Sequence, residues 1–244
     1  LIEACAFFRN KCDFYKVKIG DFSPPGTSAM FRGMEFFHNE QKVRIKPSWI
    51  LKFQSRLSRN SGTWAEWRSL IGMMIYGAGV LSIPFCSFFH ILKFYARHFS
   101  TLPRCNLILW KEAKKEFDTL CQLIITNDPI SPCSKKEEKR IFISDACKDE
   151  KRMSWGGLTI SSNFVVLTVS GTFDSYFIES SINELETMAL FYTLSHFSAF
   201  LKPYHIIPTY LDSQVAMYII EKTSSSSFKL NCRLKSLFDF LFSI

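Results

Sequence analysis

A short apolar stretch that runs into an acidic residue, Ile141 to Cys147, narrows the choice of folds more than any other part of the chain. Its sequence, Ile-Phe-Ile-Ser-Asp-Ala-Cys, predicts a buried strand that presents Asp145 at its exposed end. Two later segments carry further carboxylates: Glu186 lies near the start of a helical pattern, and Asp212 ends an apolar strand pattern. We expect the three carboxylates to meet. Because hard divalent cations prefer carboxylate oxygens, they form a candidate magnesium site.

The order of patterns in the second half predicts an α/β domain. It follows a loop with two prolines and a run of charges, from 127 to 140. We expect strands at 141–145, 154–161 and 163–172, a helix at 182–201, a strand at 205–211, and helices at 213–222 and 230–243. Three strands followed by a helix and another strand are typical of a sheet in which a crossover helix joins parallel neighbours.

The first half predicts a small hairpin followed by helices. Residues 29–37 and 42–47 alternate as strands do, with Gly33 inside the first strand, where a glycine lets a backbone or ligand approach closely. Helical apolar spacing follows at 48–58 and at 107–125. The expected domains are residues 1–60, a helical region at 61–134, and the α/β domain at 135–244.

Residues 69–92 allow a competing interpretation, because they contain no Lys, Arg, Asp or Glu over the length that a bilayer demands. Against a membrane span, Pro84 divides the stretch into two pieces of soluble-helix length, and three glycines interrupt it. We therefore expect two packed helices and no membrane, with a transmembrane protein as the alternative.

Charge and cysteine spacing narrow the class of protein. The net charge is +8, and most of it comes from residues 1–60, where 11 Lys and Arg face 5 Asp and Glu. A cationic surface attracts polyanions, so nucleic acid is the leading expected partner. The simpler explanation of the positive charge is that it keeps the protein soluble. The eight cysteines include no CxxC pair, which argues against a zinc site or a disulfide scaffold. We expect an intracellular protein, cytoplasmic or nuclear.

Four motifs follow one another in this half of the chain: Asp145-Ala146-Cys147, Trp155-Gly156-Gly157, Glu186 with Ala189 and Leu194, and Asp212-Ser213-Gln214. With them, residues 141–243 resemble a ribonuclease H domain. Glu186 fits the helix motif of that family because an alanine follows three residues on and a leucine eight residues on; Glu184 does not fit this spacing and is the fallback. The resemblance implies a mixed sheet of three antiparallel strands plus a parallel fourth, with the family's fifth strand missing.

The resemblance also implies a function. Asp145, Glu186 and Asp212 would be the catalytic metal ligands for two Mg²⁺ ions, with Mn²⁺ as an alternative, and the reaction would be endonucleolytic hydrolysis of RNA in an RNA:DNA hybrid. Asn183 and Gln214 would touch the nucleic acid. The family commonly adds a fourth acidic ligand; Asp239 is the late candidate, but its helical context is unlike the family's, so the activity of this chain alone is in question.

Before this domain, the motif Phe31-Arg32-Gly33-Met34 is similar to the hairpin with which reverse transcriptases grip a primer. Gly33, Lys16 and Lys18 are therefore expected to bind primer-template nucleic acid. Residues 70–99 are similar to the thumb and connection helices of retroelement polyproteins. The subclass resembled is that of DIRS-like and VIPER tyrosine-recombinase elements, and the chain would be part of a longer polyprotein. The alternative is a degenerate or domesticated scaffold that binds nucleic acid without catalysis.

Overall fold

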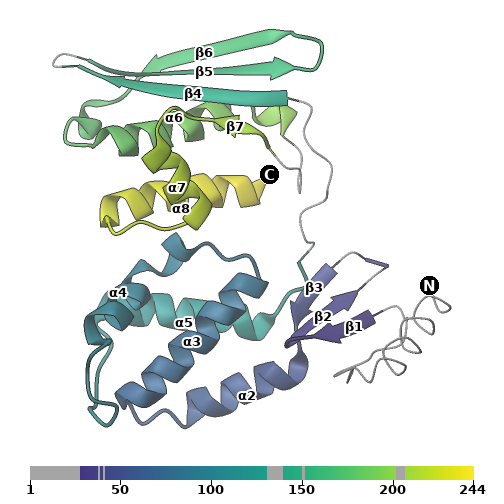
Figure 1. Ribbon diagram of the computed structural model, residues 1–244, viewed down its shortest axis with the longest axis vertical. Helices are drawn as coiled ribbons and strands as arrows, with labels where there is room; N and C mark the ends of the chain where they lie inside the picture. Colours follow the sequence, from purple (N-terminus) through teal and green to yellow (C-terminus); the bar gives the residue numbers. More distant parts are fainter. Residues whose placement is uncertain (1–27, 38, 41, 131–139, 150–151, 202–206) are drawn as a thin grey trace, which may run out of the picture.

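The structure is a computed structural model, and the residues that it describes are 28–37, 39–40, 42–130, 140–149, 152–201 and 207–244. Lys16 and Lys18, which were expected to bind nucleic acid, lie outside the described residues. The first part of the described chain combines a small sheet with helices, and the second part is built on a larger sheet (Figure 1).

The small sheet is antiparallel, with the order β1-β2-β3. It consists of β1 (Ser28–Phe31), β2 (Met34–Phe37) and β3 (Lys42–Ile45). The prediction that placed Gly33 inside a strand was wrong, because Arg32 and Gly33 form the turn between β1 and β2. Both have positive φ, 46° and 85°, as a two-residue turn matching the twist of a hairpin requires.

The helical region packs around one core. Its elements are α2 (Pro47–Ser58), α3 (Trp64–Val80), the 3₁₀ helix η1 (Phe85–Phe88), α4 (Phe89–His98) and α5 (Lys111–Thr126). Fully buried members of the core are Ile45, Phe53, Trp64, Ile71, Met74, Phe94 and Ile124. This core includes residues on both sides of position 60. The domain boundary expected at that position stays a prediction.

Pro84 separates two helical pieces as predicted. The first piece, α3, ends at Val80, and Pro84 is the N-cap of η1, which leads directly into α4. No helix in the described part of the chain combines the length and the apolar character that crossing a bilayer needs.

The larger sheet has the order β6-β5-β4-β7. Its strands are β4 (Arg140–Lys148), β5 (Met153–Ser161), β6 (Val166–Thr172) and β7 (Thr209–Tyr210). Strands β4, β5 and β6 pair antiparallel, and β7 joins β4 in parallel. This mixed sheet, with its single parallel pair, confirms the predicted ribonuclease H-like fold. β7 is shorter than the predicted strand at 205–211, and Pro208 contributes only its carbonyl, which accepts from Phe142 N–H at 3.0 Å.

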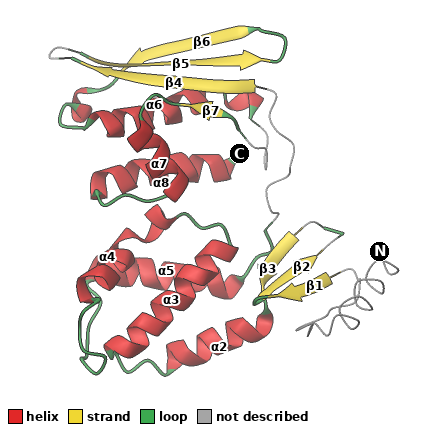
Figure 2. Ribbon diagram, in the orientation of Figure 1, coloured by secondary structure: helices red, strands yellow, loops and turns green. Residues whose placement is uncertain are grey.

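One face of the sheet is covered by helices (Figure 2). They are α6 (Ile182–His196), α7 (Gln214–Lys222) and α8 (Phe228–Ser243), with short 3₁₀ turns at Ser175–Phe177 and Ser198–Phe200. Alternate residues of β4, among them Phe142 and Ala146, are buried on this side. The sheet thus has a helix-covered face, on which these alternate residues of β4 are buried.

Candidate metal centre

β4 supplies the first carboxylate. Asp145 is exposed and lies between the buried residues Ser144 and Ala146, as the alternation of a strand dictates. It pairs in register with Gly156 of β5. The prediction that Asp145 closes the strand was wrong by a short distance, because β4 continues to Lys148.

α6 supplies the second carboxylate, and a capping box fixes its start. Ser181 N–H donates to Glu184 Oε2 at 2.7 Å, and Glu184 N–H donates to Ser181 Oγ at 3.3 Å. Lys148 Nζ fastens the preceding turn by donating to Ser180 O at 2.8 Å. The carboxylate of Glu184 is thereby engaged in capping α6. Glu186, two residues later, reaches the other two carboxylates.

The third carboxylate precedes α7. The N-cap of α7 is not Asp212 but Ser213, whose Oγ accepts from Ala216 N–H at 3.1 Å. The same Oγ donates to Asn183 Oδ1 of α6 at 3.1 Å, which ties the starts of the two helices together. Asp212 is therefore left to face the other acidic groups.

The three carboxylates converge. One oxygen from each of Asp145, Glu186 and Asp212 lies within 4.8 Å of the other two. Both aspartates are exposed, whereas Glu186 is only 2% exposed. Its Oε1 accepts from Ala146 N–H at 3.4 Å, and its Oε2 is buried without a partner among the described residues. Burial raises the pKa of Glu186 to about 7, and the nearby charges of Asp212 and Asp145 add to the effect.

This arrangement fits a hard divalent cation. All three donors are carboxylate oxygens, the type that Mg²⁺ and Mn²⁺ prefer. Glu186 has a buried oxygen without a partner among the described residues, and its pKa is raised by burial and then by the two nearby carboxylates; a shared positive charge would relieve both. The burial of Glu186 does not oppose this interpretation, because its carboxylate faces two acidic groups and a backbone N–H.

The remaining predicted residues are distributed unevenly. Asn183 and Gln214 lie in the first turns of α6 and α7, next to the cluster, and Gln214 is exposed. Gly33 lies in the first part of the chain, in the turn described above. Asp239 does not join the cluster; its carboxylate pairs with Lys235 Nζ at 2.6 Å on the exposed side of α8. The roles of Asn183, Gln214 and Gly33 in binding nucleic acid stay predictions.

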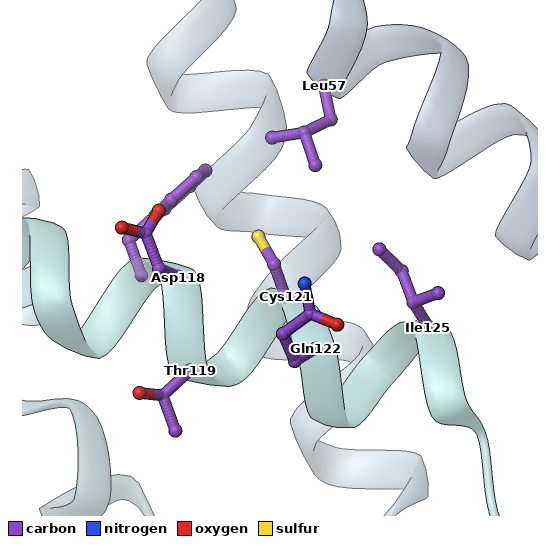
Figure 3. Close-up of a pocket in the computed structure, with 7 residues that line it drawn as sticks. Leu57, Asp118, Thr119, Cys121, Gln122 and Ile125 are labelled. Carbon is purple, nitrogen blue, oxygen red and sulfur yellow. The ribbon is translucent and has the colours of Figure 1, made fainter.

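A shallow depression beside Asp145 was not predicted from the sequence. Its lining residues are Asp145, Cys147, Ser154, Trp155, Gly156, Ser170, Gly171 and Thr172. They come from three strands, and only the observed register brings them together. The period-two placement of small polar residues in the second and third strands was the available signal. A separate hollow between α2 and α5, lined by Leu57, Cys121 and Gln122 among others, contains none of the three carboxylates (Figure 3).

Comparison with known proteins gives only distant similarities. No protein-family model matches the chain, and no curated protein matches it. Similar solved structures are foamy viral protease–reverse transcriptases. One in complex with double-stranded DNA is 13% identical, with a TM-score of 0.40 over 90% of this chain and 44% of its own. Another, in complex with an RNA/DNA hybrid, is 12% identical, with a TM-score of 0.37 over 89% and 28%.

A third, the dRH form with double-stranded DNA, is 11% identical, with a TM-score of 0.34 over 90% of this chain and 37% of its own. The chain therefore spans less than half the length of each of these structures. Because identity and TM-score are this low, the fold assignment depends on strand order and direction, and the site depends on the convergence of its three carboxylates.

Proposed function

We propose that this chain carries the ribonuclease H-type endonuclease centre of a retroelement reverse transcriptase, which hydrolyses the RNA strand of RNA:DNA hybrids. The observation that carries the proposal is the meeting of Asp145, Glu186 and Asp212 within 4.8 Å, on a sheet with the strand order of that fold. Mixed sheets host many activities, so the fold alone does not support the assignment. Three carboxylates that share one small volume do.

Each of the three residues has a role that its surroundings favour. Asp145 and Asp212 are exposed and would hold divalent cations at the surface where a substrate phosphate arrives. Glu186 would hold one with its buried Oε2, while the hydrogen bond from Ala146 N–H orients its Oε1. Mg²⁺ or Mn²⁺ bound there would supply an activated water and would neutralise charge on the leaving oxygen.

Asn183 and Gln214 are proposed to select the substrate. Asn183 Oδ1 is occupied as an acceptor from Ser213, so its amide NH₂ is the group that remains to donate. Gln214 is exposed beside it on the start of α7. The minor groove of a hybrid presents 2′-hydroxyls, which distinguish RNA from DNA. Two amides next to the acidic cluster are suited to reading that groove.

The first part of the chain is proposed to grip primer-template nucleic acid. The turn at Arg32 and Gly33 is held against α3, because Tyr76 Oη donates to Arg32 O. Trp49 packs on the Tyr76 ring with centroids 5.3 Å apart. A rigid hairpin turn suits the primer-grip role that its sequence suggests. The assignment to DIRS-like or VIPER elements belongs to this proposal, as does an origin in a longer polyprotein.

The test is cleavage of a labelled RNA strand annealed to DNA, with Mg²⁺ and with Mn²⁺. We expect the wild-type chain to cut the hybrid and to leave duplex DNA intact, and we expect Asp145→Asn to lower the rate by at least 100-fold. Glu184→Gln is the matched control, because glutamine can keep the capping box while the three carboxylates stay unchanged.

Equal residual cleavage by the wild type and Asp145→Asn would rule out the catalytic assignment. If the chain then still bound hybrid in a gel-shift assay, the outcome would favour the non-catalytic scaffold. Loss of activity in both Asp145→Asn and the control would point to a folding defect, which circular dichroism of each variant measures directly.

A further inference from the structure

The two parts of the molecule are joined at Thr223, the residue that ends α7. Its carbonyl accepts from Cys86 N–H at 2.6 Å, and its Oγ1 accepts from Phe85 N–H at 3.0 Å. Both donors belong to the first turn of η1, where backbone N–H groups have no partner within their own helix. A single residue of the sheet domain thus serves two donors of the helical region, 138 positions away along the chain for Phe85.

The backbone of Thr223 is unusual for its side chain. It adopts the left-handed conformation, with φ 54° and ψ 22°, at the C-cap of α7. Glycine is the residue that normally ends a helix in this way, because a β-branched side chain is crowded there. Threonine in place of glycine adds one feature to the cap: the hydroxyl that Phe85 N–H uses.

The surroundings of this contact are packed on both sides. Cys86 is buried against Ile219 of α7 and Leu234 of α8. The ring of Phe228, at the start of α8, lies 5.7 Å from the ring of Phe89 between centroids. On the helical side, Glu116 holds the start of α4 by accepting from His90 N–H at 2.7 Å. Thr223 is therefore attached to an element that is itself fixed.

The opposite end of the same helix carries the candidate metal ligand. α7 is nine residues long, and Asp212 lies immediately before its N-cap, Ser213. We propose that Thr223 is a positioning residue through which the helical region sets the place of Asp212 in the acidic cluster. A nine-residue helix behaves as one rigid element, so an anchor at its C-terminus limits movement at its N-terminus. This inference rests on the proposed function, because it gives the helical region a part in building the metal centre.

Other contacts also hold α7, so the expected effect is partial. Its N-terminus is tied to α6 through Ser213 and Asn183, and Ala216 and Ile219 are buried. Loss of one neutral hydrogen bond, with the contacts that depend on it, corresponds to a change of about 5- to 10-fold in a local equilibrium.

The experiment compares Thr223→Gly, Thr223→Ser and Ser226→Ala in the full chain. Glycine fits the left-handed backbone but has no hydroxyl, serine keeps the hydroxyl, and Ser226 is an exposed neighbour in the same loop. Amide hydrogen exchange by NMR would follow Phe85 and Ala216, and titration with Mn²⁺ alone would give cation affinity. In Thr223→Gly we expect both amides to exchange about 5- to 10-fold faster and Mn²⁺ to bind about 5-fold more weakly, with serine restoring both and Ser226→Ala matching the wild type.

Unchanged exchange at Ala216 in Thr223→Gly would overturn the inference, whatever the metal affinity. Faster exchange with undiminished Mn²⁺ affinity would also overturn it, because the anchor would then not reach Asp212. If the wild-type chain bound no Mn²⁺, the proposed function would fall instead, and the exchange of Ala216 would still show whether Thr223 holds α7.

Discussion

Glu186 is the residue at which folding and function make opposite demands. Its carboxylate is buried beside two other acidic groups, so ionising it in the folded chain costs free energy. A residue that only filled space on α6 would be better as glutamine or leucine. A cation bound beside Glu186 would lower its pKa from about 7 toward the ordinary value and so offset this cost.

Glu186→Gln should make the metal-free protein more stable at high pH. The folded pKa of about 7 lies above the ordinary value of 4.5, so the unfolded state holds fewer protons between these values. Stability is then lost as pH rises from about 4.5 to about 7. We expect glutamine to raise the free energy of unfolding by on the order of 1–3 kcal/mol at pH 8 and by little at pH 4.

Urea unfolding in the presence of EDTA measures this difference. Added Mg²⁺ should reverse it, because a bound cation stabilises the ionised glutamate and binds the variant less well. A wild type and variant with parallel stability curves from pH 4 to pH 8 would contradict the account of Glu186.

Burial also separates the five cysteines in the described part of the chain into two groups. It raises the pKa of Cys86 to about 11 and that of Cys121 to about 12, whereas Cys105, Cys147 and Cys232 are exposed. Because the thiolate is the reactive form, iodoacetamide at pH 8 should label the exposed three at least 10-fold faster than the buried two. Mass spectrometry of a labelling time course measures this, and denaturant should remove the difference. Fast labelling of Cys86 in the native chain would contradict the packing around η1.

At the scale of elements, β5 and α6 approach closely because Gly157 has no side chain. A Cβ at Gly157 would lie 2.0 Å from Thr193 Oγ1 on α6, whereas a Cβ at Gly156 would have nothing within 4 Å. A side chain would therefore clash at Gly157 and would find open space at Gly156. Gly157 sets the spacing of the layers, and Gly156 lies opposite Asp145.

Gly157→Ala should destabilise the domain by about 2–3 kcal/mol or more, because an extra methyl group in a packed layer forces the backbone to move. Gly156→Ala is the matched control, and we expect it to change stability by less than about 1 kcal/mol. Thermal unfolding of both variants provides the comparison. Similar losses in the two would show that β5 and α6 are not as close as described.

The sequence predicted which segments form helices and strands better than it predicted the residues at which they begin and end. Apolar periodicity located α2, α5, α7, α8 and the strands β4 to β6, and Pro84 correctly divided two helices. The prediction failed at Gly33, which lies in a turn together with Arg32. Arg32 has a positive φ, and arginine rarely adopts this conformation, so its presence in the sequence does not predict a turn. It also extended the strand now seen as β7, because an apolar run cannot reveal where pairing with β4 stops.

The three carboxylates of the candidate site could be predicted from the sequence. The hydrogen bonds that hold their helices in place could not. Spacing favoured Glu186 over Glu184, and the capping box supplies the physical reason. The roles of Ser213 and Thr223 were not visible, because each depends on a partner from a distant segment, Asn183 or Phe85. Local patterns identify which side chains are chemically suitable, and only tertiary contacts identify which of them are held in place.

At the scale of the whole molecule, a helical region and a ribonuclease H-like domain meet where η1 contacts α7 and α8. The hydrogen bonds of this contact run from η1 to Thr223 at the end of α7 and involve none of the three carboxylates. A nucleic acid could therefore reach the acidic cluster while the two parts stay together. The net charge of +8, most of it from residues 1–60, attracts a polyanion of this kind.

Asp145, Glu186 and Asp212 are proposed to share a divalent cation. Calorimetric titration of the full chain with Mn²⁺ at pH 8, for the wild type and for Asp145→Asn, measures this binding. We predict saturable binding by the wild type and an affinity at least 10-fold weaker in the variant, since one of three anionic ligands is lost. Equal affinities, or no binding by a folded wild type, would contradict the claim.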